Sequence, residues 1–131
     1  MKKIFLVLLL LGSTLFADVK NEYPSQQLLK SDIPIIDIRT AAEWRETGIL
    51  PGSIPITFFN QYGQYNMKKF LDTLHAKVDT TKPFAIICRT GSRTSMLAPY
   101  LGEKLGYKVI NLKGGIYYAI DVLKIQTQPY K

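Results

Sequence analysis

One segment of the chain gathers the residue types that activate a thiol and hold an anion. It reads Cys-Arg-Thr-Gly-Ser-Arg over residues 88–93, and Cys88 is the only cysteine among 131 residues. An apolar stretch typical of a buried strand precedes Cys88, and an amphipathic stretch typical of a helix begins at about Thr94. A strand-to-helix turn directs several backbone N–H groups into one hollow, where the helix dipole adds positive potential. We therefore expect a thiolate or an anion to be held at this turn.

The neighbours of Cys88 favour its thiolate over its thiol, because two arginines lie within five positions of it. We predict Cys88 as the catalytic nucleophile and the next five residues as the loop that binds the anionic substrate: Arg89, Thr90, Gly91, Ser92 and Arg93. Gly91 permits a positive φ angle or a close backbone approach, while Ser92 and Thr94 can cap the helix. The alternative is an inert cysteine at the end of a buried strand.

Three segments, in order, resemble the single-domain rhodanese family of thiosulfate sulfurtransferases. Residues 88–93 are similar to the family's Cys-x-x-Gly-x-Arg loop. The segment Ile-Asp-Ile-Arg-Thr-Ala-Ala-Glu-Trp at 36–44 resembles its acidic segment, and Asn-Leu-Lys-Gly-Gly at 111–115 resembles its glycine turn. The histidine that the family usually carries after the acidic segment is absent from residues 48–53. The resemblance covers about residues 22–125.

The resemblance implies a two-step transfer of sulfur through a Cys88 persulfide. Thiosulfate or a related small anion would be the donor, and cyanide or a thiol, including a thiol on a partner protein, would be the acceptor. No organic cofactor is implied. No metal site is expected either, because one cysteine and one histidine cannot supply a zinc-ligand set.

Other functions remain open on the residues alone. A persulfide carrier and a non-catalytic binding module of the same family are compatible with the pattern, although inactive members typically lack the cysteine. A cysteine phosphatase or arsenate reductase is disfavoured, because those enzymes place five residues between cysteine and arginine. This chain has four, and the shorter loop suits a sulfur atom better than a phosphate.

The first 17 residues have the layout of a secretory signal peptide. Lys2 and Lys3 precede an apolar run at 4–11, and the small residue Ala17 follows as the expected cleavage point. The run is shorter than the roughly 20 residues that span a bilayer, and we expect no later membrane span. We therefore predict a periplasmic or secreted protein whose single domain is residues 18–131.

The sequence after the signal peptide predicts an α/β domain with a mainly parallel sheet of about five strands, covered by helices on both faces. Strands are expected at 33–38, 54–59, 83–87 and 109–112, and helices at 26–30, 41–47, 67–77, 94–105 and 116–123. Pro99 is expected to disturb its helix. Residues 18–25 are interpreted as a polar lead-in. Without the signal peptide, 15 basic and 10 acidic residues give a net charge of +5. The charges are scattered, which disfavours nucleic acid as a partner.

Several other residues are given structural roles. We expect Thr40 and Glu43 to form a helix-capping box, and Arg39 to pair with Glu43 four positions later. Trp44 is assigned to the core, and His75 to the surface rather than to a catalytic base. The glycines at 114 and 115 are expected to form a turn, and the aromatic loop 58–65 is a candidate rim for the Cys88 pocket.

Overall fold

A computed structural model describes residues 18–131 of the chain. The predicted signal peptide, residues 1–17, lies outside the described residues and stays a prediction. Within the described part, no helix has the length and apolar character that crossing a membrane requires.

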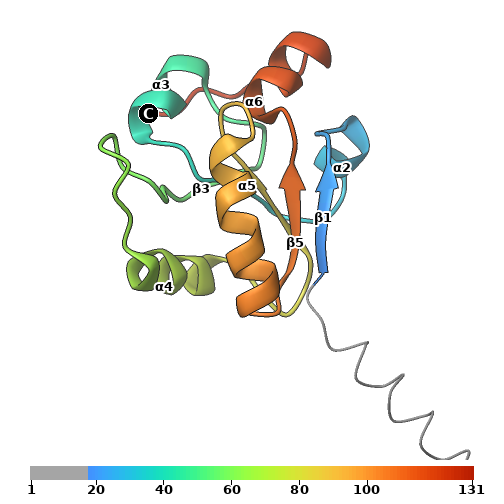
Figure 1. The fold of residues 1–131 in the computed structure, drawn as a ribbon. Helices are drawn as coiled ribbons and strands as arrows, with labels where there is room; N and C mark the ends of the chain where they lie inside the picture. Colours follow the sequence, from blue (N-terminus) through green and yellow to red (C-terminus); the bar gives the residue numbers. More distant parts are fainter. Residues whose placement is uncertain (1–17) are drawn as a thin grey trace, which may run out of the picture.

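The described residues form a parallel sheet of five strands in the order β1-β5-β4-β2-β3. The strands are β1 (Asp18–Glu22), β2 (Ile35–Asp37), β3 (Ile54–Pro55), β4 (Phe84–Ile87) and β5 (Lys108–Leu112). This arrangement confirms the predicted fold class. Because the strands are parallel, their carboxyl ends lie at the same end of the sheet, where α3 and α6 also lie in Figure 1.

Helices cover both faces of the sheet. They are α2 (Gln26–Lys30), α3 (Ala41–Thr47), α4 (Met67–Lys77), α5 (Ser92–Pro99) and α6 (Gly115–Tyr117). Two π-helical turns, η1 (Tyr100–Lys104) and η2 (Tyr118–Val122), continue α5 and α6. Alternate strand residues point to opposite faces. Ile36 and Ile86 pack with α4 and α5, whereas Ile35 and Ile87 pack with α2 and α6.

The helix after Cys88 changes its hydrogen-bonding pattern at Pro99. α5 ends at Pro99, and the chain continues as the π-helical turn η1, in which Leu105 N–H donates to the carbonyl of Tyr100 at 3.2 Å. The turn that Pro99 crowds stays α-helical, and the change of helix type falls in the turn after it. The disturbance predicted at Pro99 itself stays a prediction.

Two strand predictions were wrong. Residues 18–22 are not a lead-in but the edge strand β1, which pairs in parallel with β5. The strand expected at 54–59 is reduced to Ile54–Pro55, although Ile56 and Phe58 still donate backbone hydrogen bonds to Asp37 and Ile38. Pro55 has no N–H for a ladder and is tolerated because β3 is the other edge of the sheet.

Candidate active site

Cys88 directly follows β4, at the carboxyl end of the parallel strands. The chain turns over three residues and enters α5, whose N-cap is Gly91 with a φ angle of +104°. A side chain on Gly91 would be strained at this angle, and its Cβ would lie 3.2 Å from the backbone nitrogen of Gly114. The predicted need for glycine at this position is thus confirmed. The cap itself uses no side chain, so the prediction that Ser92 caps the helix was wrong.

The sulfur of Cys88 is buried against the start of α5 and accepts a backbone hydrogen bond there. The residue has 0% exposure. Gly91 N–H donates to the sulfur at 3.2 Å, and the Thr94 hydroxyl lies 3.6 Å from it. The amino end of α5 adds its positive potential on the same side. The Gly91 N–H and the helix end favour negative charge on Sγ, which is what a nucleophilic thiolate requires. Thr94 was expected to cap the helix and to donate a hydroxyl hydrogen bond at this turn, and its hydroxyl does donate to the carbonyl of Gly91.

Backbone N–H groups that follow the glycine turn bind the first two carbonyls of the Cys88 loop. Ile116 N–H donates to the carbonyl of Cys88 at 2.9 Å, and Tyr117 N–H donates to the carbonyl of Arg89 at 3.2 Å. Gly115 makes this approach possible, because a Cβ there would lie 2.6 Å from the Cys88 carbonyl oxygen and collide with Arg89. The predicted turn is confirmed, and it also positions the loop that carries the nucleophile.

A second set of hydrogen bonds fixes the end of the loop at Gly91. The hydroxyls of Thr94 and Ser95 both donate to the carbonyl of Gly91, at 3.2 and 2.7 Å. The buried side chain of Asn111 on β5 donates to Ser95 Oγ at 3.2 Å. The loop is therefore tied to the sheet as well as to α6, which leaves its backbone little freedom.

Arg93 is held by a carboxylate from another part of the chain. Its two terminal nitrogens donate to the two oxygens of Glu43 on α3, each at 2.7 Å. Burial raises the pKa of Glu43, but the hydrogen bonds from Arg93 and Thr40 outweigh burial and lower that pKa to about 2. The Glu43 hydrogen bonds in turn raise the pKa of Arg93. Arg93 was predicted to bind the anionic substrate, and in this structure its guanidinium joins α5 to α3.

The expected pairing of Arg39 with Glu43 was wrong. Arg39 is fully buried and pairs with Asp37, to which its Nη2 donates at 2.8 Å and its Nε at 2.9 Å. Its remaining donors reach the Thr47 hydroxyl at 2.9 Å and the Gly48 carbonyl at 3.0 Å. The capping box of Thr40 and Glu43 is present as predicted. Arg39 is therefore a structural residue beneath α3.

Arg89, Thr90 and Ser92 are the exposed members of the loop. The guanidinium of Arg89 lies over the ring of Tyr117, 4.9 Å from its centroid, and also hydrogen-bonds to the Tyr117 hydroxyl. Arg89 has no carboxylate partner within residues 18–131, so its charge is available to an approaching anion. Tyr117 was not singled out from the sequence, where it follows the glycine turn without a motif.

The other predicted residues lie where they do not touch the sulfur. Trp44 is buried and packs edge-on against Tyr130, as expected for a core residue. His75 is exposed on α4, where its Nε2 and the Tyr107 hydroxyl are 2.6 Å apart. The aromatic loop lines a different pocket, which none of residues 88–94 contributes to. Residues 18–131 contain no group of three or more potential metal ligands.

Comparison with known proteins agrees with this architecture. Residues 19–118 match the family described as Rhodanese-like domain. A sulfurtransferase of Allochromatium vinosum is 26% identical over 100 residues, which is 76% of this chain and 83% of that protein. An uncharacterised protein of Rickettsia prowazekii is 30% identical over 84 residues, covering 62% of this chain and 66% of its own length.

A crystal structure shares the fold. The rhodanese-like domain protein of Staphylococcus aureus superimposes with a TM-score of 0.54 at 24% identity, over 76% of this chain and 88% of that one.

Proposed function

Because the chain belongs to the rhodanese-like domain family, we propose that it is a thiosulfate sulfurtransferase that works through a Cys88 persulfide. The observation that carries the proposal is the Gly91 N–H that donates to the sulfur at 3.2 Å, at the amino end of α5, with the Thr94 hydroxyl oxygen 3.6 Å away. These groups stabilise a thiolate before the reaction and the terminal sulfur of a persulfide after it.

In the first step the Cys88 thiolate attacks the outer sulfur of thiosulfate. A new S–S bond forms to Cys88, the old S–S bond breaks, and sulfite leaves with the bonding electron pair. The exposed charge of Arg89 attracts the dianionic donor and offsets the charge on the departing sulfite. Arg93 supports this step by holding the loop in place through Glu43.

In the second step a nucleophilic acceptor attacks the outer sulfur of the persulfide. The S–S bond breaks, Cys88 leaves as the thiolate, and the acceptor keeps the sulfur. Cyanide would become thiocyanate, and a thiol would become a persulfide. The cycle needs no oxidant, because the donor brings its sulfur already in the zero-valent state.

The burial of Cys88 favours a small donor over a protein donor. A sulfur with 0% exposure cannot meet a second protein surface without movement of the loop side chains. Thiosulfate is far smaller than a protein and requires a smaller movement of these side chains. The persulfide carrier and the non-catalytic module remain the alternatives, and they differ from the proposal in the second step or in both steps.

The deciding experiment is the intact mass of the purified protein after exposure to thiosulfate, with Cys88→Ser as the matched control. We expect the wild type to gain one sulfur atom and to lose it on addition of cyanide, with thiocyanate produced. The control should gain nothing. A stable gain that neither cyanide nor a thiol removes would indicate a carrier. The absence of any gain would eliminate thiosulfate as the donor.

We also propose that the protein is exported and cleaved after Ala17, on the strength of the basic and apolar pattern in residues 1–17. Cleavage there would leave β1 complete, since that strand begins at Asp18. Intact mass of the protein recovered from the periplasm or medium tests this, because the mature chain would begin at Asp18. A chain found at full length in the cytoplasm would refute export.

A further inference from the structure

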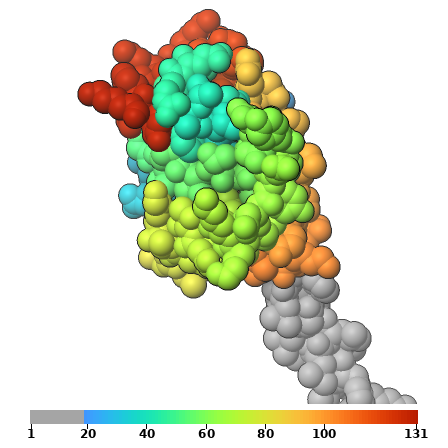
Figure 2. All heavy atoms as spheres, turned by 90° about the vertical axis from the view of Figure 1, so that its left-hand side faces the viewer, coloured from blue at the N-terminus to red at the C-terminus, as the bar shows by residue number. Residues whose placement is uncertain are grey.

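A pocket lies beside β3, which is an edge strand of the sheet, and Cys88 does not line it. It is formed by β3, the loop that follows β3, and the first half of α4, and its volume is about 560 Å³. Figure 2 faces this side of the molecule, with the loop and α4 in green and yellow-green below α3 in cyan. Small-molecule sites commonly have volumes of about 300 to 1,000 Å³. The pocket is therefore large enough for a compound well above the size of thiosulfate.

The inner wall of the pocket is apolar and aromatic. Ile56, Phe58 and Phe70 are buried side chains that line it. Tyr65 stacks on Phe58 with ring centroids 4.9 Å apart and an interplanar angle of 21°, yet 58% of Tyr65 is exposed. An exposed ring that is already fixed against another ring offers a flat surface at low conformational cost. This wall suits a planar, apolar ligand body.

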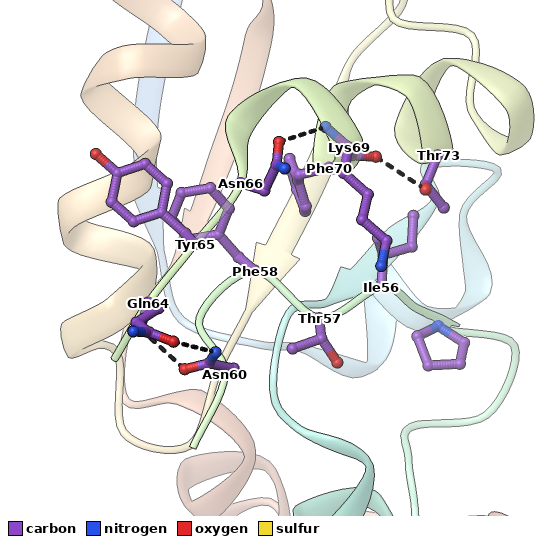
Figure 3. A pocket seen from close by; sticks show the side chains of 11 residues that line it. Ile56, Thr57, Phe58, Asn60, Gln64, Tyr65, Asn66, Lys69, Phe70 and Thr73 are labelled. Atoms are coloured by element: carbon purple, nitrogen blue, oxygen red, sulfur yellow. Dashed lines mark hydrogen bonds between the residues drawn. The ribbon is translucent and has the colours of Figure 1, made fainter. Parts of the chain in front are cut away.

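The charged side chain that lines the pocket is a cation. No aspartate or glutamate lines it, and the Lys69 ammonium has no carboxylate partner within residues 18–131. Figure 3 shows the Lys69 side chain directed into the pocket, toward Ile56 and Thr57. Lys68, the preceding residue, is instead paired with Asp72 at 2.7 Å and does not line the pocket.

Two amide side chains add further donors. The oxygen of Asn66 accepts from the Lys69 backbone N–H at 3.0 Å, and the oxygen of Gln64 accepts from Asn60 at 3.1 Å. Both oxygens are thus engaged, whereas the amide nitrogens of Asn66 and Gln64 have no partner within the described residues. Figure 3 shows Gln64 on the opposite side of the pocket from the Lys69 ammonium, so the site for an anionic group is assigned to Lys69, with no carboxylate among the lining residues.

The loop that carries Tyr65 is ordered by its own hydrogen bonds. The side-chain oxygen of Asn60 accepts from the backbone N–H groups of Tyr62 and Gln64, each at 2.9 Å, and Asn60 N–H donates to the Gln64 carbonyl at 2.8 Å. Figure 3 shows Asn60 and Gln64 facing each other across this loop. A ligand would therefore meet a preformed wall and lose little free energy in ordering it.

We propose that this pocket binds a small organic anion with a planar apolar body, of the aryl carboxylate or aryl sulfonate class. The ring of the ligand lies against Tyr65 and the apolar wall, and its anionic group meets Lys69. The site is independent of sulfur transfer, because no residue of the Cys88 loop lines it.

The test is a titration of the protein with benzenesulfonate, followed by backbone amide NMR shifts. Benzenesulfonamide is the neutral probe of the same shape. We expect saturable shifts at Thr57, Lys69 and Thr73, whose residues line the pocket. The neutral probe should bind about two- to fivefold more weakly, as the loss of one exposed charge contact predicts. The Cys88→Ser variant should bind benzenesulfonate as the wild type does.

Matched variants locate the contacts. Lys69→Gln should weaken benzenesulfonate binding about two- to fivefold, and Lys68→Gln should leave it unchanged. Tyr65→Ala should weaken both probes about threefold or more, because the stacking surface is lost. Tyr62→Ala is the control on the same loop, since Tyr62 is 76% exposed and does not line the pocket. Shifts confined to residues 88–94, no shifts at all, or equal effects within either pair of variants would overturn the proposal.

Discussion

Arg93 and Glu43 form a two-pronged ion pair that joins the nucleophile loop to the helix after β2, with both N–O distances at 2.7 Å. The two residues are 50 positions apart in the chain. Thr40 also donates to Glu43, so the carboxylate links the start of α3 to the start of α5. The contact makes the geometry around Cys88 depend on a residue that does not touch the sulfur.

The stabilising effect of Glu43 should disappear in acid. The pKa of Glu43 is about 2 in the folded protein, below its ordinary value of 4.5, so its contribution is complete above pH 4.5 and is lost as the pH falls through about 2. Glu43→Gln should reduce the free energy of unfolding by about 1 to 2 kcal/mol at pH 7, a modest amount because both partners keep some solvent contact. Urea denaturation of both proteins between pH 2 and 7 measures this. A difference that stays constant across the range would contradict it.

Gly115→Ala should distort the nucleophile loop. The added Cβ would lie 2.6 Å from the carbonyl oxygen of Cys88, where backbone must move, and the φ angle of +61° adds strain. Gly106→Ala is the control, since Gly106 has a similar φ of +74° with nothing near its Cβ position. The control should lose about 1 kcal/mol of stability and keep its rate of persulfide formation. Gly115→Ala should lose more stability and form persulfide about 10- to 100-fold more slowly. Equal rates in the two variants would refute the positioning role of Gly115.

Arg39→Met should be among the most destabilising single changes in the protein. It would leave the buried carboxylate of Asp37 without its cation, at a cost of about 3 to 5 kcal/mol. Adding Asp37→Asn to that variant should restore part of the loss, because the uncompensated charge is removed. Lys68→Met, which breaks an exposed pair, should cost less than about 1 kcal/mol. Denaturant unfolding of the three variants checks the ranking, and similar losses for Arg39→Met and Lys68→Met would show that burial is not the cause.

Cys88 should discriminate between thiol reagents by size. Because the residue has 0% exposure, a reagent reaches the sulfur only when neighbouring side chains move, and a smaller reagent requires a smaller movement. Methyl methanethiosulfonate should therefore react much faster than N-phenylmaleimide, relative to the rates of each with free cysteine. Unfolding in urea should abolish the difference. Intact-mass time courses give both rates, and equal protection from the two reagents would show that reagent size does not control access to the sulfur.

The local features of the fold were predictable because their signals lie within a few residues. Thr40 and Glu43 form the expected capping box, and the apolar run before Cys88 is the buried strand β4. β1 gave no such signal. As an edge strand it pairs on one side only, and four of its five residues are polar, three of them exposed. Its assignment as a strand depends on β5, which lies far away in the sequence.

The ion pairs of the site show the limit of reasoning from spacing. The spacing of Arg39 and Glu43 suits a pair only if both residues are helical, but Arg39 precedes the N-cap Thr40 and lies outside the helix. Its side chain instead turns back to Asp37, two positions away. The true partner of Glu43 is Arg93, and a contact between residues so far apart has no periodicity to reveal it.

The first strand of the described chain and the last are direct neighbours in the sheet. β1 pairs with β5 from Asp18 with Lys108 to Glu22 with Leu112, and the side chains of Asn21 and Asn111, 90 positions apart, are hydrogen-bonded at 2.9 Å. During synthesis β1 therefore has no partner strand until β5 has been made. The sheet cannot be completed until residues 108–112 have left the ribosome, and so long a closure is slow as well as late. Any cellular machinery that requires an unfolded chain has that whole interval in which to act.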